Sequence, residues 1–125
     1  MLITFICTYY FMYYVCGMIL LNIKPLSVNE AWQGKRFKTK NYLNYEKTVL
    51  LMLPQRCEIP DKISIEFIFG FSSNGSDLDN PIKPILDILQ KKYNFNDRHI
   101  YKIVAQKKIV NKGNEFIQIK INSIN

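Results

Sequence analysis

The sequence has little of what a disulfide framework or a zinc site needs. Its three cysteines, Cys7, Cys16 and Cys57, form no CxxC pair, and their number is odd. We therefore expect reduced thiols in a cytoplasmic setting. The sequence also lacks internal repeats, low-complexity segments and any linker long enough to separate two domains. With 125 residues, 48% hydrophobic and 22% charged, it is predicted to fold around one core.

Charged residues are absent from residues 1–17, MLITFICTYYFMYYVCG, and the uncharged run continues to about Leu21. That length is typical of a membrane span. However, no positive region precedes the run, as a signal peptide requires, and the segment is rich in Tyr and Phe. Because Met18 begins a strand-like segment of its own, we expect it to be the natural start. Residues 1–17 are then a misassigned extension and residues 18–125 the domain; a membrane anchor is the alternative.

Acidic residues are in the minority, since 17 Lys and Arg against 10 Asp and Glu give a net charge of +7. This balance favours an anionic partner such as nucleic acid, although a basic protein without such a partner has the same composition. In residues 31–40, AWQGKRFKTK, cations alternate with aromatic residues, which suits phosphate contact and base stacking. A solvated basic loop is the equal alternative. The predicted DNA contacts are Lys35, Arg36, Lys38, Lys40 and Arg98.

Hydrophobic patterning predicts about four strands and two helices. The strands are expected at 18–24, 62–71, 100–110 and 115–121, and the helices at 42–53 and 81–92. Residues 27–30 are interpreted as a loop, and the last two strands as a β-hairpin that turns at Gly113. The order β-α-β-α-β-β predicts an α+β fold, in which both helices cover one face of a small mixed sheet.

The segment 76–83, SDLDNPIK, is the strongest candidate for chemistry. On an extended backbone Asp77 and Asp79 point to the same face, and Asp79 or Asn80 is placed to cap a helix that starts at Pro81. Two carboxylates on one face repel each other unless a cation lies between them, and oxygen ligands suit Mg²⁺ or Mn²⁺. Ordinary loop acids with a helix cap are the alternative interpretation of both aspartates.

An ordered set of residues resembles the RusA family of Holliday junction resolvases. That family carries a D-x-D-N-x-x-K run, a helix with a further Asp, and a D-D or N-D pair at the head of the next strand. Here these positions are Asp77, Asp79, Asn80, Lys83, Asp87, Asn96 and Asp97. Residues 25–29, PLSVN, resemble the family's P-x-S-x-N loop. The resemblance covers about residues 18–121 and departs at 74–76, NGS, where some members carry arginines. Junction affinity or the preferred cut sequence can therefore differ.

The resemblance implies a RusA-like fold and a homodimer that nicks four-way DNA junctions in a bacterial or phage-infected cell. It makes Asp77, Asp79 and Asp97 the ligands of Mg²⁺ and Lys83 the catalytic cation beside the phosphate. No small-molecule cofactor and no membrane partner are expected. Lys83 as a surface partner of Asp79 is the alternative, and His99 has no assigned role. Two other functions stay open: a catalytically silent DNA-binding module of the same fold, and a small membrane-anchored protein.

Overall fold

The computed structural model describes residues 18–33 and 37–124. The predictions for residues 1–17, and the DNA contacts assigned to Lys35 and Arg36, lie outside these described residues. None of the helices in the described ranges is both long enough and apolar enough to cross a membrane.

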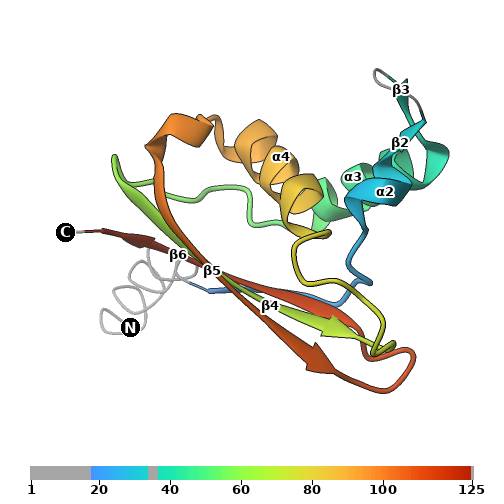
Figure 1. Cartoon of the computed structure of the whole chain (residues 1–125). Coiled ribbons are helices and arrows are strands. Elements are labelled where there is room, and N and C mark those ends of the chain that lie inside the picture. Colours follow the sequence, from blue (N-terminus) through green and yellow to red (C-terminus); the bar gives the residue numbers. More distant parts are fainter. Residues whose placement is uncertain (1–17, 34–36, 125) are drawn as a thin grey trace, which may run out of the picture.

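A mixed four-stranded sheet forms one layer of the molecule (Figure 1). From edge to edge its strands are β1 (Ile19–Leu21), β6 (Phe116–Ser123), β4 (Ile63–Phe71) and β5 (Ile100–Ile109). Strand β4 is parallel to β5 and antiparallel to β6, and β1 is antiparallel to β6. The predicted α+β class and small mixed sheet are thus confirmed.

The helices of the described residues lie on one side of this sheet, as expected from the sequence (Figure 1). They are α2 (Val28–Ala31), α3 (Lys40–Met52) and α4 (Ile82–Tyr93), followed by a 3₁₀ turn, η2 (Asp97–His99). Two very short strands, β2 (Trp32–Gln33) and β3 (Phe37–Lys38), pair with each other apart from the main sheet. They lie within residues 31–40, which the sequence left open as a site of phosphate contact and base stacking or as a solvated basic loop.

The core lies between the sheet and α3 and α4, and strand β4 supplies its centre. Alternate residues of β4 are fully buried, as the pattern KISIEFIFGF predicts. On α4 the buried residues recur at helical spacing. The central contacts are made by Ile63, Ile65, Phe67, Phe69, Val49, Ile85, Ile88, Leu89, Ile117 and Ile119.

The predicted hairpin between the last two strands is wrong, because β4 lies between β5 and β6. Helix α4 connects β4 to β5 as a parallel crossover. The chain then crosses the end of β4, where the Val110 N–H donates to the Phe71 carbonyl at 2.7 Å. Strand β4 has the more apolar inner face and takes the central position, where both its edges are paired. Strand β5, largely exposed, takes an edge.

Two local predictions at helix starts are also wrong. Residues 27–30 are not a loop: Ser27 and Glu30 form a capping box that starts α2. Helix α4 begins at Ile82, with Pro81 as its N-cap and no side-chain cap, so neither Asp79 nor Asn80 caps it. Pro81 has a helical conformation, with φ −81° and ψ −8°, and its side chain has no oxygen with which to accept from the first helical N–H groups.

One buried carboxylate joins β3, α3 and α4. Glu46 is 8% exposed, and it accepts hydrogen bonds from the Lys38 ammonium at 3.0 Å and the Lys91 ammonium at 3.1 Å. Burial alone raises the pKa of the Glu46 carboxyl, but the hydrogen bonds and charges of the two lysines outweigh it and leave the pKa below its ordinary value. Lys38, a predicted DNA contact, is therefore engaged within the protein.

Replacing Glu46 by glutamine is expected to lower the free energy of unfolding by about 1–2 kcal/mol at pH 7. The effect is small because both lysines are partly exposed and solvent screens their charges. The pKa of the Glu46 carboxyl is lower in the folded protein than in the unfolded chain. The stabilisation is therefore fully present above the pKa of the unfolded chain, and it is lost as the pH falls through the pKa of the folded protein. The difference between wild type and E46Q, measured by urea unfolding, should therefore shrink below about pH 4.5. E58Q, a charge-matched change at an exposed position, is the control. If E46Q and E58Q changed the free energy of unfolding equally, the ion pairs of Glu46 with Lys38 and Lys91 would not stabilise the fold.

Candidate functional site

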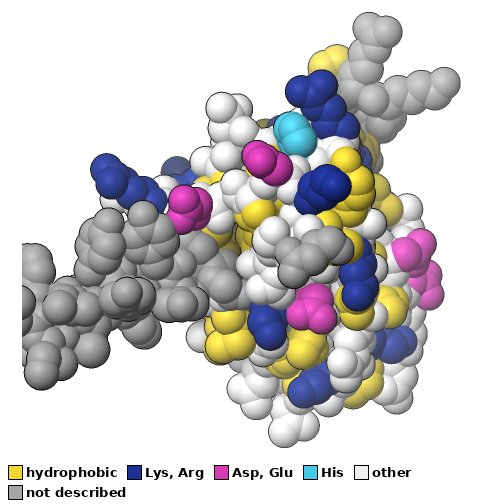
Figure 2. All heavy atoms as spheres, turned by 90° about the vertical axis from the view of Figure 1, so that its left-hand side faces the viewer, with side chains coloured by type: hydrophobic (Ala, Val, Ile, Leu, Met, Phe, Trp, Pro, Cys, Tyr) yellow, Lys and Arg dark blue, Asp and Glu magenta, His cyan; other side chains and the backbone are white. Residues whose placement is uncertain are grey.

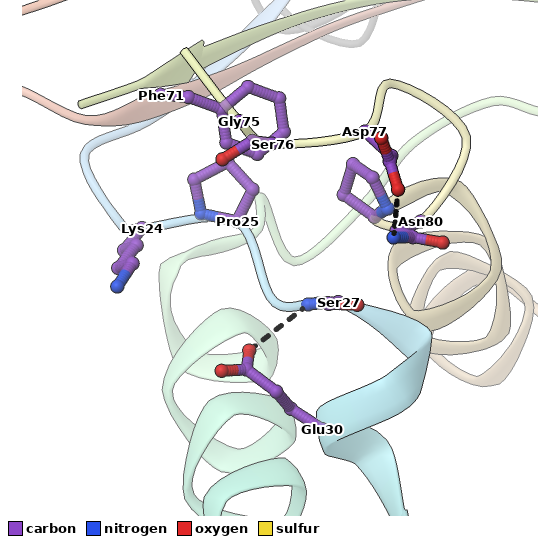
Figure 3. Close-up of a pocket in the computed structure, with 10 residues that line it drawn as sticks. Lys24, Pro25, Ser27, Glu30, Phe71, Gly75, Ser76, Asp77 and Asn80 are labelled. Atoms are coloured by element: carbon purple, nitrogen blue, oxygen red, sulfur yellow. Dashed lines mark hydrogen bonds between the residues drawn. The ribbon is translucent and has the colours of Figure 1, made fainter. Parts of the chain in front are cut away.

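A pocket of about 290 Å³ opens between the segment before α2 and the loop that joins β4 to α4 (Figure 3). Its lining combines apolar rings with polar and charged groups. The lining residues are Lys24, Pro25, Ser27, Glu30, Phe71, Gly75, Ser76, Asp77, Asn80 and Pro81.

Backbone contact holds the two sides of this pocket together. The Val28 N–H, at the start of α2, donates to the Asn80 carbonyl at 2.9 Å. On the α2 side, the Ser27 N–H donates to the Glu30 carboxylate at 3.4 Å (Figure 3). On the other side, the Asn80 amide donates to the Asp77 carboxylate at 3.4 Å. The structure thus brings residues 25–29 against the start of the acidic run.

Asp79 lies in the turn that leads into α4 and does not line the pocket. Its side chain is exposed. Its backbone carbonyl accepts a hydrogen bond from the Ile82 N–H at 3.2 Å, at the first residue of the helix. The residue is therefore fixed through its main chain, while its carboxylate faces solvent.

Lys83, Asp87 and Asp97 belong to a second cluster, which follows one side of α4. The Lys83 ammonium is 2.8 Å from the Asp87 carboxylate, so its ion-pair partner is Asp87 and not Asp79. The hydrogen bond from Lys83 to Asp87 raises the pKa of the lysine; burial opposes this, and the charges of Asp87 and Asp97 add to it. Asp97, the first residue of η2, accepts a hydrogen bond from the Gln90 amide.

The donor chemistry of the predicted ligands fits Mg²⁺, since all three are carboxylates. In the part of the chain that the structure describes, however, no three His, Cys, Asp or Glu side chains gather closely enough to hold a metal ion. Asp77 is at the pocket, Asp79 at the start of α4, and Asp97 beside Gln90. The convergence of these acids on one cation stays a prediction.

The basic residues lie in several places. Lys40 is exposed at the start of α3 and Arg98 is exposed in η2. His99 accepts from the Asn96 N–H at 3.4 Å and so helps to form the turn. On the face shown in Figure 2, which is the left-hand side of Figure 1, Lys and Arg side chains alternate with acidic and apolar ones. On this face, the described residues therefore present scattered positive charges and no continuous basic stripe.

Of the aromatic residues expected to stack on bases, Phe37 is 72% exposed. Trp32 already stacks on Tyr42, with 6.0 Å between ring centroids and 25° between ring planes. Phe37 is therefore the better placed of the two to meet a partner.

Sequence reasoning missed two cations that lie next to the pocket. Lys24 lines it, and Lys107 donates to the Ser76 carbonyl at 2.8 Å and to the Asn74 carbonyl at 3.4 Å. Strand alternation was the available signal, because it places Lys107 on the same face as Ile103, Ala105 and Ile109.

A comparison with models of known protein families found no match, and a search of curated proteins also found none.

Proposed function

We propose that this chain is a magnesium-dependent, structure-selective DNA endonuclease of the RusA type, which resolves four-way junctions as a homodimer. The observation that carries the proposal is the meeting of residues 25–29 with residues 77–80 at one pocket, through the bond from Val28 to Asn80. These two segments are the ones whose motifs resemble the family. They are far apart in the sequence, and a chance similarity of either motif would not require them to be neighbours.

The proposed roles follow from the chemistry of the side chains. Asp77, Asp79 and Asp97 supply the oxygen donors for the cation. A Mg²⁺ ion held by these carboxylates would supply polarisation of a scissile phosphate and activation of a water. Lys83, whose pKa is raised, stays protonated at neutral pH and can offset negative charge that develops on a phosphate. Exposed Lys40 and Arg98 are placed for sequence-independent phosphate contacts, whose strength falls as salt rises.

The test uses the full chain and a synthetic four-way junction with a label on each strand in turn. We expect symmetric paired nicks in Mg²⁺ that disappear when EDTA replaces the metal. A linear duplex with the sequence of one arm, the matched substrate, should stay intact. Junction binding without cleavage over a range of Mg²⁺ and Mn²⁺ would overturn the nuclease and support the silent DNA-binding module.

A further inference from the structure

Lys107 interrupts an otherwise apolar row on the inner face of β5. In the parallel register with β4, the inner-face residues lie beside buried side chains: Ile103 beside Ile65, Ala105 beside Phe67, Lys107 beside Phe69 and Ile109 beside Phe71. The Lys107 side chain is exposed, and its flexible stem lets the ammonium reach past this row to polar partners.

The partners are two backbone carbonyls of the loop that carries Asp77. The Lys107 ammonium donates to the Ser76 carbonyl at 2.8 Å and to the Asn74 carbonyl at 3.4 Å. The Ser76 carbonyl belongs to the peptide bond that joins Ser76 to Asp77, and this unit is planar. A hydrogen bond that fixes the carbonyl therefore also fixes the direction in which the chain enters Asp77.

The rest of this loop is held at its two ends. Near β4 the Ser72 hydroxyl donates to the Glu115 carboxylate at 3.1 Å, and before α4 the Asn80 carbonyl accepts from Val28. Between these points residues 73–75 are exposed, and the bonds of Gly75 and Ser76 to Ser73 are local to the loop. Among the described contacts, Lys107 ties the middle of the loop to the sheet. Without the Lys107 hydrogen bonds, fewer contacts offset the conformational entropy that residues 73–76 lose on ordering.

We propose that Lys107 is a positioning residue, which holds the backbone before Asp77 so that the carboxylate keeps a fixed place at the pocket. The inference rests on the proposed function for its catalytic consequence, but its structural part does not. Lys107 acts through the loop and need not touch DNA, which separates it from a lysine that only adds positive charge.

The experiment compares K107M with K108M in the full chain. Lys108 follows directly on the same strand, is exposed and lies beside Gly70 on the opposite face. Both substitutions remove one positive charge, so any general loss of phosphate attraction should be similar. A third variant, K107R, retains donors that can reach the carbonyls and should retain most of the activity.

We expect K107M to cut the junction about 10²-fold more slowly at saturating Mg²⁺, because a small displacement of a reacting group has an effect of that order. Its junction Kd should stay within about threefold of that of K108M. Amide hydrogen exchange over residues 73–77 should be faster in K107M alone. Equal cleavage and equal exchange in K107M and K108M would overturn the inference. If the wild type cuts no junction, the proposed function fails, and the exchange comparison still decides whether Lys107 holds the loop.

Discussion

Replacing Asp79 by asparagine is expected to abolish junction cleavage while binding stays the same or becomes tighter. Loss of one charge-stabilising group in a catalytic site typically costs about 10²–10³-fold in rate. Removing a negative charge near the phosphates should at the same time favour DNA binding. The measurement is cleavage of the labelled four-way junction, with binding of the same junction measured in Ca²⁺ or EDTA.

In the structure, D79N is expected to change the charge of the side chain without disturbing the fold. The Asp79 side chain is exposed, and the turn uses its backbone carbonyl, which accepts from Ile82. Asparagine has nearly the same shape, so the start of α4 should be unchanged. D61N is the matched control, because Asp61 is exposed and precedes the opposite end of β4. Full cleavage by D79N, or an equal loss of cleavage in D61N, would show that Asp79 is not a residue of the catalytic site.

The elements with strong periodicity were predictable from the sequence. Strand β4 alternates between buried and half-buried residues, and α4 repeats its apolar residues at helical spacing, so one core between them follows. The start of α2 was equally accessible, since Ser27 and Glu30 have the S-x-x-E spacing of a capping box. It was missed because the helix has four residues and shows no periodicity.

The pairing of the last strands was not predictable from local pattern. A short turn with Gly113 (φ +95°) favours a hairpin, but the order of strands in a sheet depends on which strand most needs two neighbours. Strand β4 buries five alternate side chains, from Ile63 to Phe71. Which strands pair with the two edges of β4 depends on the sheet as a whole. Here β5 and β6 each pair with one edge, so β4 separates them.

The candidate site also has one part that was predictable from the sequence and one part that was not. Spacing along the chain placed Asp77 and Asp79 before a helix, and the structure agrees. The neighbours that restrain other residues come from distant segments, and no spacing rule reports them: Asp97 accepts from Gln90, and Lys38 pairs with Glu46. The sequence therefore supplied candidate side chains, whereas the contacts that hold each of them are visible only in the structure.

Replacing Gly70 by alanine is expected to cost about 1–3 kcal/mol of unfolding free energy, as overpacking does in a close-packed structure. Gly70 is opposite Phe116 in the antiparallel register of β4 and β6. A Cβ at this position would lie 2.3 Å from Phe116 Cδ1 and 2.4 Å from Cε1. The Phe116 ring occupies the space above the glycine and would have to swing away from the sheet.

Urea unfolding of G70A and G75A separates this clash from a general glycine effect. A Cβ at Gly75 would meet only the Ser73 hydroxyl at 3.7 Å, an ordinary contact, so G75A should change stability by less than about 0.5 kcal/mol. The F116A background provides the decisive comparison, because the ring is then absent and adding G70A should cost little. If G70A is as destabilising without the ring as with it, the cost lies in the backbone of β4, and Phe116 does not require glycine at this position.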